Sequence, residues 1–322
     1  MTGFFNVYKE AGYTSHDVVA IIRKLTRGKV GHTGTLDPQA QGVLPICLGR
    51  ATKLADMVMG QDKSYIAEVV LGVVTDTGDM TGQVLKRSPV TFDKDAIIRT
   101  VEGFIGPQMQ VPPMYSAIKI GGEKLYELAR KGQTVERKPR AVNIDSIKVL
   151  EFQAEKNSFT IDVTCSKGTY IRSLCMDIGE ALGPGAAMGS LLRTRSGAFT
   201  LDGAVKLEEI KEAAASGLLS DMLLPVEAVL PFPRMYVKAE GLAMAKNGNP
   251  LPFGLVDMPD KSKLWPPVIP CLTRNPLSFG EDGGIPDQVR DDDSLVWLHG
   301  SDGLIGLYSY DGQGKLRLEV MM

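Results

Sequence analysis

The segment GHTGTLDPQAQGVLPICLGRATK, from Gly31 to Lys53, constrains the fold more than any other part of the sequence. It contains a single carboxylate, Asp37, which Pro38 follows directly. Proline fixes its own φ and biases the preceding residue toward an extended backbone, and the glycines of the segment permit positive φ and close backbone approach. The segment therefore predicts a rigid loop that holds one carboxylate in a fixed position.

A rigid, isolated carboxylate suits nucleophilic attack, general base catalysis or cation binding. Because no second acidic residue lies within ten positions of Asp37 on either side, the local sequence lacks the carboxylate pair of a glycosidase. The purely structural interpretation is that Asp37 caps a turn or a helix, which is common for an Asp-Pro pair. The residues alone leave these alternatives open.

Length and composition favour a globular protein with room for two domains. Of the 322 residues, 43% are hydrophobic and 23% are charged, and no apolar run approaches the roughly 18 residues of a membrane-spanning helix. The N-terminus lacks the basic and apolar regions of a secretory signal, so we expect a cytoplasmic protein. Four scattered cysteines without a Cys-x-x-Cys pair, together with three histidines, predict neither a disulfide framework nor a metal centre.

Charge is distributed unevenly, although the formal net charge is only −2. Of the 36 basic and 38 acidic residues, 4 and 6 lie between Lys261 and Ser294, which leaves equal numbers in the rest of the chain. From Tyr115 to Arg140 there are seven basic residues and three acidic ones. A patch of this charge suits the phosphate backbone of a nucleic acid, and a solvated protein face is the alternative.

Hydrophobic periodicity predicts helices interspersed with strands, which favours the α+β class. Thr14 or Ser15 can cap a helix whose apolar residues recur at i, i+3, i+4 and i+7. The pair Gly121–Gly122 predicts a short hairpin followed by a short helix. Further elements are expected as helices over 94–104, 171–182 and 207–215 and as strands over 64–74, 142–152 and 158–165.

A domain boundary is predicted at Pro225–Arg234, because three prolines in ten residues prevent regular structure. Beyond it, a short helix over 240–246 and the segments LVWLHG, LIGLYSY and KLRLEVM, joined by glycine turns, predict a small β module. The segment Trp265–Asp293 contains five prolines and ends in an acidic run. We interpret it as an insertion without a catalytic role.

The motif around Asp37 closely resembles the active-site motif of the bacterial tRNA pseudouridine synthases of the TruB type, GHTGxLDPxAxGxLPxxxGxATK. Further blocks match that family in order, and the resemblance spans roughly residues 3–230: GYTS, SYIAEVVLG, TDTGD, QVPPMYSAIKIGGEKLYELARKG, SKGTYIRSLCMDIGEALG and LLRTRSGAF. The resemblance implies a mixed, mainly antiparallel sheet with flanking helices. It also implies a C-terminal β module similar to the PUA-type RNA-binding domain.

The resemblance implies an enzyme that isomerises uridine 55 in the T-arm of tRNA to pseudouridine without a cofactor or a metal. In this family the base is detached at N1, turned and reattached through C5. Asp37 falls on the catalytic aspartate, and attack at C1′ of the ribose or at C6 of the uracil stays open. Tyr65 matches the tyrosine that packs against the base and is proposed to abstract a proton. Arg172 matches the arginine that pairs with the aspartate, and we expect it to keep the pKa of Asp37 low.

The substrate-binding positions of the family fall on His32, Tyr170 and Leu192. His32 is expected to contact the flipped nucleotides, since an imidazole ring can stack on and hydrogen-bond to an unstacked base. Tyr170 and Leu192 are expected to form walls of the pocket. The basic insert near residues 107–140 resembles the part of the family that clamps the T-arm.

The domain organisation implied by the resemblance is a catalytic domain over 1–230 and a PUA-like RNA-binding module over 235–322. An insertion near 265–293, which is foreign to the family pattern, interrupts the module. The expected partner is tRNA, bound by a protein that works as a monomer and away from membranes.

Two other functions stay open. The basic insert and the C-terminal β module also fit an RNA-binding or RNA-folding protein with a vestigial catalytic site, although binding alone does not need Asp37, Tyr65 and Arg172 together. A carboxylate-based N-glycosidase that releases uracil is a weaker alternative. Hydrolysis needs a water admitted to the site, whereas isomerisation needs the base retained in a closed pocket.

Overall fold

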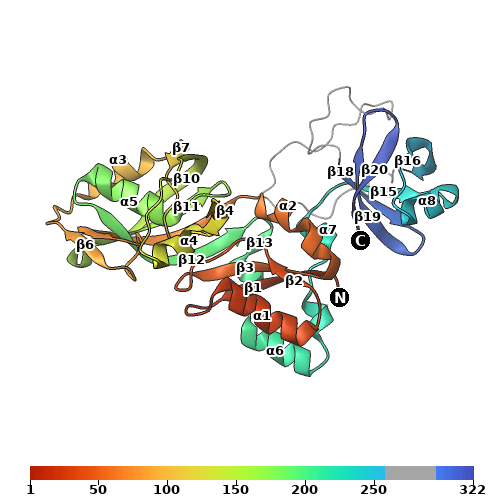
Figure 1. Cartoon of the computed structure of the whole chain (residues 1–322), viewed down its shortest axis with the longest axis horizontal. Helices are drawn as coiled ribbons and strands as arrows, with labels where there is room; N and C mark the ends of the chain where they lie inside the picture. Colours follow the sequence, from red (N-terminus) through yellow and green to blue (C-terminus); the bar gives the residue numbers. More distant parts are fainter. Residues whose placement is uncertain (258–294) are drawn as a thin grey trace.

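A computed structural model describes residues 1–257 and 295–322, and two separate large β-sheets organise them (Figure 1). One sheet is built between residues 3 and 206 and carries the longer helices, and the other is built between residues 234 and 321. The predicted class is confirmed: an α+β fold with a mixed, mainly antiparallel sheet, flanking helices and a small C-terminal β module. The expected insertion over 265–293 lies outside the described residues.

The larger sheet is antiparallel between most neighbours, with parallel pairing between β1 and β14 and between β3 and β12. Two short strands extend it, β2 beside β3 and β13 beside β12. Along the main path the strands are β14 (Val205–Lys206), β1 (Gly3–Lys9), β3 (Gln41–Leu48), β12 (Ala186–Ser196), β4 (Lys63–Leu71), β11 (Ser158–Cys165), β10 (Arg140–Gln153) and β7 (Gly106–Gln110), and the two additions are β2 (Val30–His32) and β13 (Phe199–Thr200).

Strands β1 and β3 are buried on both faces. Because side chains alternate across a strand, Phe5 and Ile46 point into the main core under the helices, whereas Phe4 and Cys47 point into a second core. That second core also contains Trp297 of the C-terminal module. The two parts of the chain therefore share buried apolar surface beside β1.

The longer helices form where periodicity predicts them. The Thr14 side chain accepts a hydrogen bond from the Asp17 N–H at 3.1 Å, and the Asp17 carboxylate accepts one from the Thr14 N–H at 2.8 Å, which is a capping box that starts α1. α1 and α6 pack at the β1–β3 end of the sheet, and α3 and α5 pack against β10 and β12 (Figure 1). These helices are α1 (Ser15–Thr26), α3 (Lys94–Glu102), α5 (Ile171–Leu182) and α6 (Leu207–Ala215).

The single strand predicted over 64–74 is wrong, because the chain breaks at Gly72 into β4 and β5 (Val73–Thr75). Gly72 has φ +77°, a left-handed conformation that turns the chain out of the main sheet. β5 then pairs with β6 (Val84–Arg87) in a separate hairpin. The turn that joins β5 to β6 carries Thr77 and Asp79, which reach the site described below.

Gly42 pairs with Arg193 where β3 runs parallel to β12, and we predict that Gly42→Ala destabilises the fold. Its φ is +103°, and a Cβ at this position would lie 2.2 Å from the backbone oxygen of Arg193. Gly183 has a nearly equal φ of +102° with nothing within 4 Å of such a Cβ, so Gly183→Ala is the matched control for backbone strain. Urea unfolding should show a loss of stability that is about 1–3 kcal/mol larger for Gly42→Ala. Equal losses would show that the pairing of β3 with β12 tolerates a side chain at position 42.

The C-terminal module is a twisted sheet of short strands with one short helix, α8 (Leu242–Lys246), beside it (Figure 1). Its three longest strands are the ones that the sequence predicts. In sheet order the strands are β16 (Leu251–Pro252), β20 (Lys315–Met321), β19 (Gly303–Tyr310), β18 (Leu295–Gly300), β15 (Arg234–Val237) and β17 (Val256–Asp257).

The proline-rich stretch 225–234 is not free of regular structure, contrary to the prediction. It contains a one-turn helix, α7 (Val226–Val229), which Pro225 precedes at the N-cap. Proline is tolerated there because the first turn of a helix leaves its N–H groups unpaired. The stretch also packs firmly, since Trp297 Nε1 donates to the Leu230 carbonyl at 2.7 Å.

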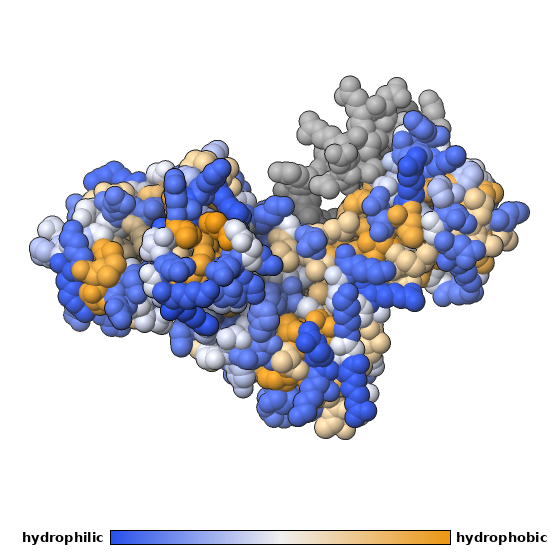
Figure 2. Space-filling view, viewed as in Figure 1, coloured by the Kyte–Doolittle hydropathy of each residue, from blue (hydrophilic) through white to orange (hydrophobic). Residues whose placement is uncertain are grey.

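The basic insert contains the predicted hairpin, β8 (Lys119–Ile120) and β9 (Glu123–Lys124), followed by α4 (Leu125–Arg130). Gln110 anchors the first residues of the insert, because its side chain accepts from the Tyr170 N–H at 3.0 Å and donates to the Tyr170 carbonyl at 3.3 Å. The base of the insert is therefore tied to the start of α5. Figure 2 shows mainly hydrophilic residues over the face on which α4 lies.

Candidate active site

Asp37 lies in the loop between β2 and β3, and the N-terminal segment holds the residues on either side of it. The Ser15 hydroxyl accepts from the Leu36 N–H at 2.9 Å and donates to the Leu36 carbonyl at 3.2 Å. The Pro38 carbonyl accepts from Lys9 Nζ at 3.0 Å. The loop is therefore fixed both before and after the carboxylate.

Lys9 is a buried cation that sequence analysis did not assign to the site. Its ammonium group donates to the carbonyls of Tyr13 at 2.7 Å and Glu10 at 3.1 Å, in addition to Pro38. Burial lowers the pKa of Lys9 to about 8, and the charge of Asp37 opposes that change. Lys9 therefore supports the Asp37 loop through its backbone.

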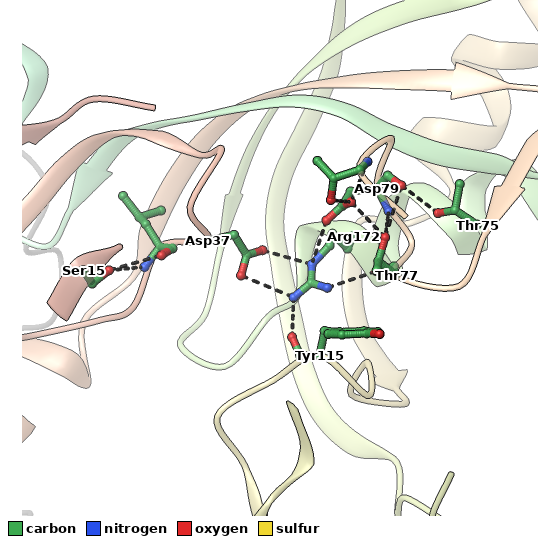
Figure 3. Close-up of polar contacts among 9 residues, drawn as sticks. Ser15, Asp37, Thr75, Thr77, Asp79, Tyr115 and Arg172 are labelled. Carbon is green, nitrogen blue, oxygen red and sulfur yellow. Dashed lines mark hydrogen bonds and ion pairs between the residues drawn. The ribbon is translucent and has the colours of Figure 1, made fainter. Parts of the chain in front are cut away.

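Arg172, in the first turn of α5, forms a two-point ion pair with Asp37 (Figure 3). Arg172 Nε lies 3.0 Å from Asp37 Oδ2, and Nη2 lies 3.4 Å from Oδ1. The arginine side chain is 5% exposed and the aspartate side chain is 37% exposed. A planar guanidinium thus holds the carboxylate from the protein side and leaves it accessible from solvent.

Further groups fix the Arg172 guanidinium, and the sequence interpretation missed them. Arg172 Nη1 donates to the Thr77 carbonyl at 3.0 Å, and Nη2 donates to the Tyr115 carbonyl at 2.7 Å (Figure 3). Asp79 Oδ2 lies 4.0 Å from Nε, and Asp79 Oδ1 accepts from the hydroxyls of Thr77 and Thr81. The TDTGD block carried the signal for Asp79, since it places acidic residues in a polar turn next to a matched strand.

The pKa of Asp37 is raised above its ordinary value because burial disfavours the charged form, while the opposing charge of Arg172 lowers it. The charge of Asp79 adds to the rise, and that of Lys9 opposes it. The expectation that the pKa of Asp37 is kept low is therefore wrong, because desolvation outweighs the ion pair. Arg172 lowers the pKa of Asp37 as expected, but the net change in that pKa is a rise.

Tyr65 lies on β4 and is 8% exposed, directly opposite Arg193 of β12. Because directly paired residues of neighbouring strands share a face of the sheet, the Tyr65 side chain lies beside that of Arg193. Burial raises the pKa of Tyr65, and the charge of Arg193 opposes this rise. Arg193, which pairs with Tyr65, also donates to the Gly34 carbonyl at 3.0 Å, so Tyr65 lies near the start of the Asp37 loop.

His32 lies at the end of β2, next to the start of the Asp37 loop. Its Nδ1 accepts from the Gly34 N–H at 3.4 Å, and its ring meets that of His16 edge-on with the centroids 5.4 Å apart. The pKa of His32 is lowered to about 4, mainly by burial and also by the charges of His16 and Arg193. His32 is therefore neutral near pH 7 and presents an uncharged aromatic ring.

Tyr170 immediately precedes α5, so it stands two residues from Arg172, and Gln110 holds its backbone. Burial raises the pKa of the Tyr170 hydroxyl, and the charges of Arg140 and Arg172 oppose this rise. The charge of Asp37 reaches this group as well. Tyr170 is therefore a neutral, half-buried phenol beside the ion pair.

The side chains of Leu192 and Tyr65 lie on opposite faces of the sheet. In the register of β12 and β4, Leu192 pairs with Ile66, whereas Leu191 pairs with Ala67 and Arg193 with Tyr65. Because side chains alternate between faces, Leu191 shares the face of Tyr65 and Leu192 lies on the other face. Leu191 is thus the leucine that the structure places next to this part of the site.

No helix within residues 1–257 and 295–322 is long and apolar enough to cross a membrane. Over the same ranges there is no group of three or more His, Cys, Asp or Glu side chains placed to hold a metal ion. The site itself offers one accessible carboxylate, one buried guanidinium paired with it and one buried phenol.

Comparisons with known proteins extend this description. A family model described as "TruB family pseudouridylate synthase (N terminal domain)" matches residues 23–171, and one described as "tRNA pseudouridylate synthase B C-terminal domain" matches residues 172–231. The tRNA pseudouridine synthase B of Alkaliphilus oremlandii is 50% identical over 251 residues, which cover 77% of this chain and 82% of the relative. That of Lachnoclostridium phytofermentans is 51% identical over 259 residues, which cover 78% and 84%.

A solved structure of an H/ACA ribonucleoprotein bound to a substrate RNA containing 2'-deoxyuridine is also similar. It matches with a TM-score of 0.68 and 25% identity, over 99% of this chain and 84% of that chain. The fold is therefore that of a pseudouridine synthase, an enzyme of the isomerase class. Within that class, the chain belongs to the TruB family of tRNA pseudouridine synthases.

Proposed function

We propose that this enzyme converts uridine 55 in the T-arm of tRNA to pseudouridine, with Asp37 as the catalytic carboxylate. The observation that supports this most strongly is the two-point pair of Asp37 with Arg172. It presents one accessible carboxylate on a loop that is held through Leu36 and Pro38. The name shared by the relatives, tRNA pseudouridine synthase B, supports tRNA as the substrate.

The chemistry begins with extrusion of the uridine, because a base inside a folded loop is shielded from the enzyme. Flipping costs a few kcal/mol, which stacking and phosphate contacts offset. Asp37 attacks C1′ or C6, the N1–C1′ bond breaks, the uracil turns within the site, and a C5–C1′ bond forms. The bond to Asp37 breaks as C5 bonds to C1′ if attack is at C1′, or as the C5 proton leaves if attack is at C6, and N1 takes up a proton from water. The proton on C5 then passes to Tyr65, and the electron pair of the C5–H bond returns to the ring as the C5–C6 double bond.

The residues around the carboxylate have separate roles in orienting it and in binding the nucleotide. Arg172 orients Asp37 for attack, and His32 and Tyr170 provide aromatic surface for the extruded nucleotide. Leu192 remains a predicted wall residue, and Leu191 is the alternative that the strand register favours. These steps require neither a metal nor a cofactor.

RNA binding is proposed for two parts of the chain outside the site. The insert near residues 107–140 would grip the T-arm backbone with its excess of basic residues. The module over 235–322 would contact RNA further from the base, beside a catalytic domain over 1–230. We further propose that the enzyme acts as a monomer in the cytoplasm.

Incubation of an unmodified tRNA transcript with the enzyme tests the proposal, with pseudouridine mapped by carbodiimide labelling and primer extension. We expect one new stop, at position 55, and none in a transcript with cytidine at that position. Labelling only at another position would contradict the assignment of the substrate base. Release of free uracil would indicate an N-glycosidase, and tight binding without product would indicate an RNA-binding protein.

The raised pKa of Asp37 predicts how the reaction rate depends on pH under acidic conditions. A carboxylate attacks only when it is ionised, so the single-turnover rate should fall as the pH decreases through the pKa of Asp37. The midpoint should lie above the ordinary aspartate value of 3.8, because burial raises this pKa. Rates from about pH 4 upward would measure it, and a midpoint at or below the ordinary value would show that the ion pair dominates over burial.

A further inference from the structure

Arg193 on β12 is a buried cation for which the described residues supply no carboxylate partner. The residue is 1% exposed, and the groups that bind or perturb it within residues 1–257 and 295–322 are carbonyls and a phenol. Removing a guanidinium from water without an opposing charge is costly. A residue kept in such a position is expected to have a role besides packing.

The contacts of Arg193 join the parts of the site that carry chemistry. Its Nε donates to the Val43 carbonyl at 2.7 Å, and its Nη2 donates to the Gly34 carbonyl at 3.0 Å, at the start of the Asp37 loop. Its backbone pairs with Tyr65 across β12 and β4, so the two side chains lie next to each other on one face of the sheet. One side chain therefore connects β3, the Asp37 loop and the tyrosine of β4.

The positive charge of Arg193 changes the pKa values of the ionisable groups around it. It lowers the pKa of Lys9 and of His32, adding to the larger effect of burial on each. It also opposes the rise that burial causes in the pKa of Tyr65. Arg193 therefore favours the phenolate form of Tyr65, while burial and the charges of Cys165 and Asp37 make the net change in the pKa of Tyr65 a rise.

We propose that Arg193 is a positioning residue for proton abstraction, which aims the Tyr65 oxygen at the substrate and stabilises its phenolate form. The inference rests on the proposed function, since it assigns Tyr65 the proton of C5. The phenol first loses its own proton to water. The phenolate oxygen then takes the proton from C5, and the C5–H electron pair stays in the ring. The phenol that results can be deprotonated again for the next turnover.

The titratable groups that face Tyr65 are few among the described residues. They are Arg193 from β12, Cys165 from β11 and Asp37 from the loop, and the charged forms of the last two raise the pKa of Tyr65. Arg193 is the cation of this set. Removal of Arg193 should therefore raise the pH at which Tyr65 ionises and can act as a base.

A double-mutant cycle between Arg193→Met and Tyr65→Phe tests the proposal, with thermal unfolding, T-arm RNA affinity and single-turnover rates against pH as readouts. We expect Arg193→Met to keep its RNA affinity, to lose roughly 10²-fold in rate, and to shift the alkaline rise of the rate to higher pH. In the Tyr65→Phe background, Arg193→Met should change the rate little further. Arg195→Met, two residues along β12, is the matched control and should leave the pH profile unchanged, because Arg195 bonds to Ser64 and not to Tyr65.

A loss of rate that is equal in the presence and absence of the Tyr65 hydroxyl would overturn the proposal, as would an unshifted pH profile in Arg193→Met. If Arg193→Met fails to fold, Arg193→Lys serves instead. Lysine keeps the positive charge but lacks the planar guanidinium group, so the rate should fall while the pH profile stays near that of the wild type. A rate equal to that of the wild type would overturn the positioning role. If Tyr65→Phe alone keeps the full rate, the role proposed for Tyr65 fails. If Tyr65→Phe loses the rate and Arg193→Met does not, this inference alone fails.

Discussion

Replacement of Asp37 by asparagine is expected to abolish pseudouridine formation while the protein stays folded and binds T-arm RNA. The amide has nearly the same shape as the carboxylate, but it cannot ionise, so it can neither attack the nucleoside nor accept a proton. We expect the single-turnover rate to fall on the order of a thousandfold or more. Release of tritium from C5-labelled uridine in the transcript measures this rate directly.

Asp202→Asn is the matched control for Asp37→Asn, because it removes the same charge from an exposed position. The control should keep the rate of the wild type, and both variants should give cooperative thermal unfolding. Near-normal tritium release by Asp37→Asn would show that another group does the chemistry.

The second large effect is expected for Arg172→Met. This change removes the two-point partner of Asp37 and leaves the carbonyls of Thr77 and Tyr115 without their donor. A carboxylate that is no longer oriented should react roughly 10²-fold more slowly. The midpoint of the acid side of the pH profile should also rise, because Arg172 is the main group that lowers the pKa of Asp37.

Two variants separate orientation from charge in this experiment. Arg172→Lys keeps a positive charge but cannot bind both oxygens, so it should move the pH midpoint less than Arg172→Met does while the rate remains low. Arg99→Met removes an exposed arginine from α3 and should change neither quantity. An unchanged pH midpoint in Arg172→Met would show that the pair does not control the ionisation of Asp37.

Local signals predicted much of the fold. The helix cap at Thr14, one of two predicted candidates, the hairpin at Gly121–Gly122 and the periodic face of α5 are each specified within a few residues, and each forms. The break at Gly72 was missed because β-branched residues on both sides favour a strand. The positive φ of Gly72 and the separate pairing of β5 account for the break.

The parts of the site that sequence did not predict depend on tertiary structure. Arg172 is held by the carbonyls of Thr77 and Tyr115, and any residue type could have provided a carbonyl. The raised pKa of Asp37 reflects its burial, which neither its neighbours in sequence nor its expected partner determines. The difference between Leu191 and Leu192 is a matter of strand register, which changes the face of every side chain with a shift of one residue.

The central claim is that the Asp37 carboxylate meets an extruded uridine between Arg172 and Tyr65. The most direct measurement is a crystal structure of Asp37→Asn in complex with a T-arm stem-loop carrying the target uridine. The account predicts that the uridine is flipped out, with its ribose or its C6 edge in van der Waals contact with residue 37 and its ring against Tyr65. A target base that stays stacked in the loop, or that lies in another part of the protein, would contradict it.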